Sequence, residues 1–241
     1  MYDSALHHIP DDPPVLTWTW ITDRALDLRR PPPQTGLDAA AWDAVRHHGG
    51  LWVNGHPAAE RCDAGSRIQV YAFGASPPAL SQVPLKILLD RDGVVAVDKP
   101  SGLSTQRTRA SAHRCLQAML IDRLGDPGLR AVHRLDRATS GVVLFARTKA
   151  ATQALHAQFR GRTVQKRYLA VVAPPPAEDA FEVDAPLARA PTPQDAPAHL
   201  VMAVSDAPDA QPSHTRFEVA GRRDDRAVVR ALPVTGRTHQ I

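Results

Sequence analysis

The residues best suited to chemistry lie in one short segment, residues 133–141 (HRLDRATSG). Its single carboxylate, Asp136, stands between Arg134 and Arg137, in a turn that is rich in hydroxyl groups and closed by a glycine. Neighbouring guanidinium groups favour the ionised form of a carboxylate. An ionised aspartate suits a nucleophile, or a base for a strongly activated proton, better than a general acid. The alternative is that Asp136 only ties the turn together through salt bridges.

Signatures of other enzyme classes are missing from the sequence. It has no GxxxxGK[ST] phosphate-binding loop, no GxSxG nucleophile elbow, no SxxK and no HExxH motif. None of its 11 histidines belongs to a cluster with zinc-ligand spacing, so we expect no metal site. The common hydrolases and metalloenzymes are therefore poor interpretations of this chain.

The elements around Asp136 follow from turn and cap signals. Two short apolar runs flank Asp92-Gly93, which is typical of a β-hairpin turn. Apolar residues at helical spacing predict a helix over 116–124 that ends at Gly125. A strand is expected over 142–146, directly after the segment that carries Asp136.

The chain beyond this strand is predicted in the same way. Thr148 caps a predicted helix that ends at Gly161, with a buried face that holds Ala151, Leu155 and Phe159. A strand is expected over 164–172. The segment 174–212 contains nine prolines, so we expect it to be rich in loops with little regular structure. Two further strands are expected after it, over 215–219 and 227–232.

The N-terminal part predicts a separate small α–β module, residues 1–78. A helix is expected over 38–48, followed by strands over 51–53 and 67–71, with Pro77-Pro78 as the linker that ends the module. The pattern of residues 49–71 resembles the second half of an S4-type RNA-binding module. A plain α–β cap is the alternative, because this pattern has few basic residues.

Composition and charge suggest the compartment and the partner. No apolar run approaches the ~20 residues of a membrane span, and the first residues do not resemble a signal peptide, so we expect a soluble cytoplasmic protein. The net charge is −3 over residues 1–80, +7 over 81–160 and zero over 161–241. Arginine supplies most of the positive charge, and this suits an anionic partner. The alternative is that these residues only form a solvated basic face.

Four segments in order resemble the RluA-type family of pseudouridine synthases. They are 99–102 (KPSG), 133–141 (HRLDRATSG), 166–170 (KRYLA) and 235–241 (TGRTHQI). The resemblance implies an α+β catalytic domain over 79–241, with a mixed, mainly antiparallel sheet and flanking helices. It also implies a cofactor-free, monomeric enzyme that isomerises uridines in ribosomal or transfer RNA. A non-catalytic RNA-binding protein is the alternative.

The same resemblance implies the site residues. Asp136 matches the essential aspartate, as nucleophile or as base. Tyr168 matches a tyrosine that packs against the target base, or is a core tyrosine, and Lys166 should share its strand face. Arg134 matches an arginine that fills the space left by the extruded base, or only keeps Asp136 ionised. Lys99 and His133 are expected to be structural.

The last residue, Ile241, matches an apolar residue that lines the uracil pocket. In the family an arginine that pairs with the aspartate follows directly, with further strands and helices. We therefore expect this sequence to be a fragment of a longer product, and to be poorly folded or inactive as given.

Overall fold

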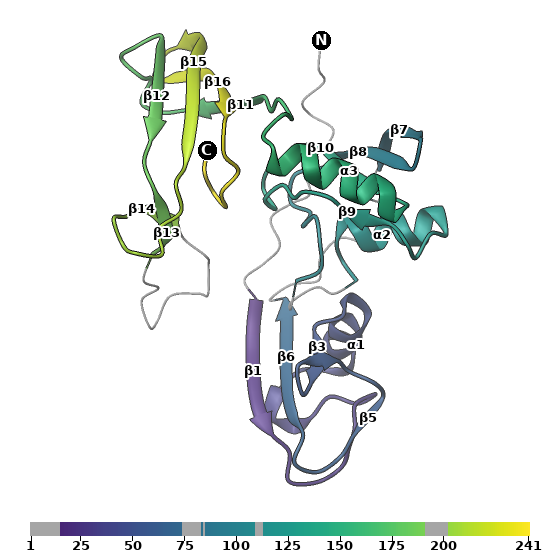
Figure 1. The fold of residues 1–241 in the computed structure, drawn as a ribbon. Coiled ribbons are helices and arrows are strands. Elements are labelled where there is room, and N and C mark those ends of the chain that lie inside the picture. The colour runs from purple at the N-terminus through teal and green to yellow at the C-terminus, as the bar shows by residue number, and fades with distance from the viewer. Residues whose placement is uncertain (1–14, 74–82, 84, 109–112, 191–201) are drawn as a thin grey trace. The chain divides into compact units, whose positions relative to one another are not determined.

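The computed structural model describes residues 15–73, 83, 85–108, 113–190 and 202–241. The chain divides into two compact units, Met1–Gln153 and Ala154–Ile241, whose elements are labelled in Figure 1. The first unit contains β1 (Val15–Ile21), β2 (Leu26–Asp27), η1 (Pro33–Thr35), α1 (Ala39–His48), β3 (Leu51–Val53), β4 (His56–Pro57), β5 (Arg61–Cys62), β6 (Arg67–Phe73), β7 (Lys86–Arg91), β8 (Val94–Lys99), α2 (Leu116–Leu124), β9 (Arg130–Ala131) and β10 (Gly141–Ala146). Helix α3 (Lys149–Arg160) crosses the boundary.

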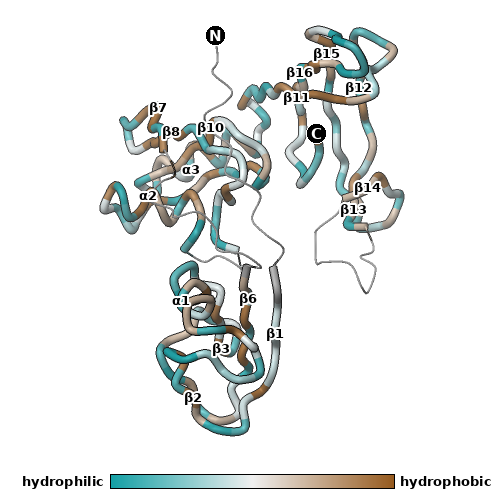
Figure 2. Tube along the Cα trace, turned by 180° about the vertical axis from the view of Figure 1, so that it is seen from behind, coloured by the Kyte–Doolittle hydropathy of each residue, from teal (hydrophilic) through white to brown (hydrophobic). Residues whose placement is uncertain are grey.

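The N-terminal residues form a sheet of order β1-β6-β3-β4 with one helix, α1. The helix begins where the Asp38 carboxylate accepts a hydrogen bond from the backbone N–H of Ala41 at 2.8 Å. Trp42 of the helix and Ile68 of β6 are fully buried in one apolar cluster. The apolar stretches of β6 stand out in Figure 2. The predicted helix and strands are therefore confirmed, whereas the expected linker, Pro77-Pro78, lies outside the described residues.

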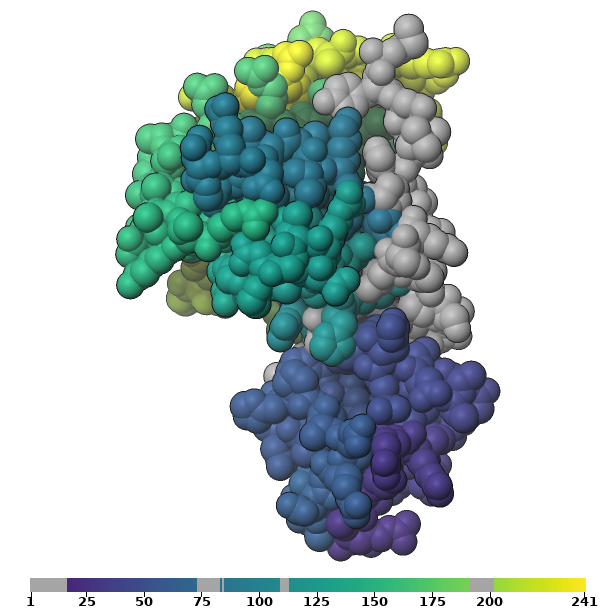
Figure 3. Space-filling model, turned by 90° about the vertical axis from the view of Figure 1, so that its right-hand side faces the viewer, coloured from purple at the N-terminus to yellow at the C-terminus, as the bar shows by residue number. Residues whose placement is uncertain are grey.

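A second sheet, of order β7-β8-β10-β9, carries the segment with Asp136. The predicted hairpin turn is confirmed, because Asp92 and Gly93 both have positive φ angles, 53° and 74°. The buried side chains of β8 and β10 form the centre of this sheet. The α2 residue Arg123 donates to the carbonyl oxygen of Leu85 at 2.8 Å. In the space-filling view of Figure 3, the blue atoms of this part of the chain lie directly against the teal atoms that follow in the sequence.

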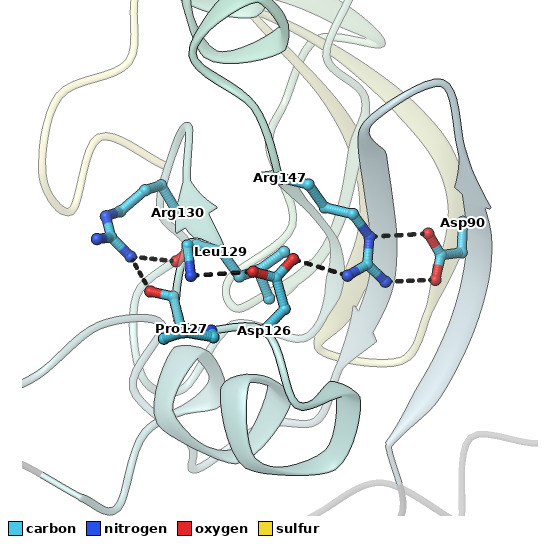
Figure 4. Close-up of polar contacts among 7 residues, drawn as sticks. Asp90, Asp126, Pro127, Leu129, Arg130 and Arg147 are labelled. Atoms are coloured by element: carbon cyan, nitrogen blue, oxygen red, sulfur yellow. Dashed lines mark hydrogen bonds and ion pairs between the residues drawn. The ribbon is translucent and has the colours of Figure 1, made fainter.

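Arg147, just after β10, links three parts of this region (Figure 4). Its guanidinium makes two hydrogen bonds to the Asp90 carboxylate of β7, at 2.7 and 3.2 Å, and one to Asp126 at 2.8 Å. The other oxygen of Asp126 accepts from the backbone N–H of Gly128 at 2.9 Å. The hydrogen bonds from Arg147 hold the pKa of Asp90 below its ordinary value.

The second unit contains one larger sheet, of order β11-β16-β15-β12, with all neighbours antiparallel. Its strands are β11 (Tyr168–Val172), β12 (Ala180–Asp184), β13 (Leu187–Arg189), β14 (Met202–Val204), β15 (His214–Arg223) and β16 (Arg226–Pro233). Strands β13 and β14 pair separately. Across the larger sheet, Phe181 and Phe217 stack with their ring centroids 5.0 Å apart.

Three expectations from the sequence need correction here. The segment 174–212, expected to have little regular structure, contains β12, β13 and β14. The strand expected from residue 164 begins at Tyr168, because the partner of Lys166 in this register would be Pro233, which has no N–H to donate. Thr148 does cap α3, but the apolar face of that helix is only half-buried.

The strand pairs among the described residues are all antiparallel, and these sheets with few helices agree with the expected α+β class. Within the described residues, no helix has both the length and the apolarity that a membrane crossing requires.

Candidate active site

The loop that carries Asp136 is fixed at its start to strand β10. The backbone N–H of Val132 donates to the carbonyl oxygen of Leu144 at 3.1 Å. In return, the ring nitrogen Nε2 of His133 accepts from the backbone N–H of Leu144 at 3.0 Å. The imidazole thus replaces a backbone acceptor and stabilises the turn, as expected from the sequence.

A buried hydroxyl group holds the residue directly before Asp136. The Oγ1 atom of Thr105 donates to the carbonyl oxygen of Leu135 at 2.8 Å and accepts from its N–H at 3.1 Å. Thr105 and Leu135 are both buried, whereas Asp136 is half-buried and Arg134 is exposed. The loop is therefore anchored through Leu135, between the exposed Arg134 and the half-buried Asp136.

The residues after Asp136 are held by the turn that follows β8. Lys99 is completely buried, and its ammonium group donates to the carbonyl oxygens of Pro100 at 2.9 Å, Leu103 at 2.6 Å and Arg137 at 3.1 Å. The backbone N–H of Gly102 also donates to the Arg137 carbonyl, at 2.8 Å. One loop thus positions the other, and the expected structural role of Lys99 is confirmed.

Charge couples this lysine to the aspartate. Burial lowers the pKa of Lys99 to about 8, the Asp136 carboxylate acts in the opposite direction, and the Arg137 guanidinium lowers this pKa further. An ammonium group in this place therefore keeps positive charge close to Asp136 without lying on the surface.

The remaining candidates belong to the second unit. Tyr168 opens β11, is half-buried and lies opposite Ala231 of β16. Ile241 is 50% exposed. The sequence suggested that Lys166 shares a strand with Tyr168, but Lys166 lies before the start of β11. Its ammonium group donates to the carbonyl oxygen of Thr235.

The structure thus places the candidates in two sets. Asp136 and Arg134 share one loop of the first unit, and Tyr168 and Ile241 lie in the second unit.

Sequence reasoning missed the polar residues that hold these loops. Thr105 and Ser101 are among them, and the Ser101 hydroxyl donates to the carbonyl oxygen of Ala138 at 2.7 Å. Gln240 was missed as well; it makes four hydrogen bonds around the loop that follows β16. The available signal was position, since all three residues lie in or near the recognised KPSG and TGRTHQI segments.

Comparison with known proteins assigns this arrangement to a class. The chain is similar to the solved structures titled "Human RNA Pseudouridylate Synthase Domain Containing 1" and "Human RNA Pseudouridylate Synthase Domain Containing 4". The TM-scores are 0.53 and 0.51, with 28% and 27% sequence identity. The first alignment covers 69% of this chain and 65% of the solved chain, and the second covers 64% and 60%. The fold is thus of the pseudouridylate synthase class.

The sequence comparisons specify the family. The family model described as RNA pseudouridylate synthase matches residues 93–241. The ribosomal large subunit pseudouridine synthase C of Pasteurella multocida (strain Pm70) is 36% identical over 162 residues, which are 67% of this chain and 48% of that protein. The protein of the same name from Escherichia coli (strain K12) is 36% identical over 155 residues, 64% of this chain and 47% of that protein. The chain belongs to the RNA pseudouridylate synthase family, and it spans about half the length of these curated relatives.

Proposed function

We propose that this chain acts in an RNA pseudouridine synthase, an enzyme that isomerises specific uridines in structured ribosomal or transfer RNA. The observation that carries the proposal is the fixed loop around Asp136. Hydrogen bonds to Leu135 on one side and to Arg137 on the other fix its backbone, while the carboxylate side chain is half-buried. Such preorganisation is what a reacting group requires.

The proposed reaction needs no net oxidant, reductant or co-substrate. The bond between ribose C1′ and uracil N1 breaks, the base turns, and a new bond joins C1′ to C5. The hydrogen on C5 leaves as a proton, and N1 gains a proton. Asp136 acts in this reaction either as the nucleophile or as the base, and both roles require its ionised form.

Three further residues surround the target nucleotide in this proposal. A stacked base has to leave the RNA before it can react, at a cost of a few kcal/mol. The exposed guanidinium of Arg134 would fill the space that the base leaves. The ring of Tyr168 would stack on the extruded uracil, and Ile241 would line its pocket with an apolar side chain.

The proposed division of labour has an S4-like, RNA-binding module within residues 1–78 and a catalytic domain over 79–241. The order of helix α1, the short strands β3, β4 and β5, and the long strand β6 supports an S4-like second half. The module has few basic residues, so we infer that it orients RNA more than it attracts it.

Structured RNA is the proposed partner, and ribosomal RNA is the first substrate to test. The charge of +7 over residues 81–160 supports a polyanionic partner. The names of the curated relatives point to the ribosomal large subunit. We propose that the protein acts as a cytoplasmic monomer without a metal.

Nucleoside analysis tests the proposal. The product of the whole gene and the 241-residue chain are each incubated with unmodified ribosomal RNA and transfer RNA transcripts, and the digested nucleosides are separated by liquid chromatography. Formation of pseudouridine by the product of the whole gene in one of these RNAs is the expected result, and the second sample shows whether the 241 residues suffice. RNA that is bound but never converted would instead favour a binding protein without turnover.

A further inference from the structure

The loop that follows β16 contains a glutamine whose amide group is fully hydrogen-bonded. The Oε1 atom of Gln240 accepts from the hydroxyl of Thr235 at 2.8 Å and from the backbone N–H of Arg237 at 2.7 Å. Its Nε2 atom donates to the carbonyl oxygen of His214 at 3.0 Å and to the hydroxyl of Thr215 at 2.9 Å. Because an amide side chain offers two lone pairs and two hydrogens, all of its capacity is used.

Thr235 connects this glutamine to strand β15 and to the segment that precedes β11. It is 7% exposed, and its hydroxyl accepts from the backbone N–H of His214, at the start of β15, at 2.9 Å. Its carbonyl oxygen accepts from the ammonium group of Lys166, two residues before Tyr168 at the start of β11. The loop is thereby tied both to β15 and to the segment that leads into β11.

The backbone next to Gln240 needs such support. His239 has a φ angle of 57°, a left-handed conformation that is uncommon for residues other than glycine. Ile241 follows Gln240 directly, so the bonds of the Gln240 side chain fix the place at which Ile241 begins.

We propose that Gln240 is a positioning residue for the reaction, with Thr235 and Lys166 as its links to the sheet. By holding the loop closed, Gln240 sets Ile241 in a fixed place relative to Tyr168. This inference rests on the proposed function, in which Ile241 lines the uracil pocket and Tyr168 stacks on the base.

Two substitutions test the proposal in the product of the whole gene, each with a matched control. Gln240→Ala removes the four side-chain bonds, and Gln158→Ala, in an exposed position of α3, is its control. Thr235→Val removes the hydroxyl but keeps the shape of the side chain, and Thr235→Ser restores the hydroxyl. The measurements are the single-turnover rate of pseudouridine formation at saturating enzyme, the affinity for the same RNA by filter binding, and the Tm.

The expected result is a selective loss of rate. Gln240→Ala and Thr235→Val each lower the single-turnover rate by about tenfold, which corresponds to about 1.4 kcal/mol. The RNA affinity stays unchanged, and Thr235→Ser and Gln158→Ala keep the wild-type rate. The double variant is no slower than either single variant, because both changes break the same unit.

Other outcomes separate this proposal from the function on which it rests. A Gln240→Ala protein as fast as an active wild-type chain would overturn the positioning role and leave the function standing. A fall in Tm with an unchanged rate would overturn it too, since the glutamine would then be only structural. If Gln240→Ala does not fold, the Thr235→Val and Thr235→Ser pair decides alone. Absence of pseudouridine with the wild-type product of the whole gene would overturn the function itself.

Discussion

The ammonium group of Lys99 and the backbone carbonyl oxygen of Arg137 lie 3.1 Å apart, although the two residues are 38 positions apart in the chain. Two further carbonyl oxygens, those of Pro100 and Leu103, accept from the same ammonium group. A single buried charge therefore ties the KPSG turn to the residue after Asp136. This contact explains how a loop without regular structure holds the backbone around Asp136 in place.

Replacing Lys99 by methionine should weaken both fold and function. Each buried carbonyl that loses its donor costs about 1–3 kcal/mol, so we expect Lys99→Met to lower the free energy of unfolding by about 2 kcal/mol or more. Urea unfolding measures the change. Lys86→Met, at an exposed lysine of β7, is the matched control, and equal stability of the two variants would contradict the role of Lys99.

The titration of Lys99 should appear in the pH dependence of stability. Its pKa is about 8 in the folded protein and 10.5 ordinarily, so between these values the unfolded chain binds more protons. Stability rises with pH wherever the unfolded state binds more protons. We therefore expect wild-type stability to rise relative to Lys99→Met between pH 8 and 10.5, measured by urea unfolding at several pH values. A constant or shrinking difference would show that Lys99 does not titrate there.

Thr105 offers a test of loop positioning without a change of charge. Thr105→Val keeps the shape of the side chain but removes the hydroxyl that bonds both backbone groups of Leu135. We expect the rate of pseudouridine formation to fall by about tenfold, the equivalent of about one hydrogen bond. Thr105→Ser should restore the rate, and loss of activity in both variants would contradict this explanation.

The hydrogen bonds of Arg147 to Asp90 and Asp126 predict a contribution to stability that is lost at acidic pH. The pKa of Asp90 is lowered by its hydrogen bonds to Arg147, so this contribution is present above the ordinary value of 3.8 and is lost as the pH falls through the folded pKa. Arg147→Met should therefore lower the Tm at neutral pH more than Arg91→Met, at an exposed arginine. The difference from wild type should shrink in acid, and a difference independent of pH would refute the electrostatic explanation.

Local signals predicted much of this fold, because each acts over a few residues. Thr148 caps its helix as expected, the helix expected over 38–48 is present, and Asp92-Gly93 turns the hairpin. The start of β11 was not predictable in the same way. It depends on the place of Pro233 in the partner strand β16, 65 residues after Tyr168, which residues 164–167 themselves do not reveal.

The residues of the candidate site likewise differ in whether the local sequence reveals their role. Asp136 stands out locally because it is a lone carboxylate between two arginines. Thr105 and Lys99 hold Asp136 indirectly, because they hydrogen-bond to backbone groups of its neighbours Leu135 and Arg137. Any residue type supplies such backbone groups. Their role therefore becomes visible only once the chain is folded.

We propose that Asp136 catalyses the rearrangement of uridine, and release of tritium from C5 of uracil measures this reaction. RNA labelled at C5 is incubated with the wild-type product of the whole gene, with its Asp136→Asn variant, and with its Asp122→Asn variant, which changes an exposed aspartate of α2. We expect release by the wild type and by Asp122→Asn, and none by Asp136→Asn, because the new C1′–C5 bond expels the hydrogen of C5. Release that persists in Asp136→Asn, or that never occurs with ribosomal or transfer RNA, would contradict it.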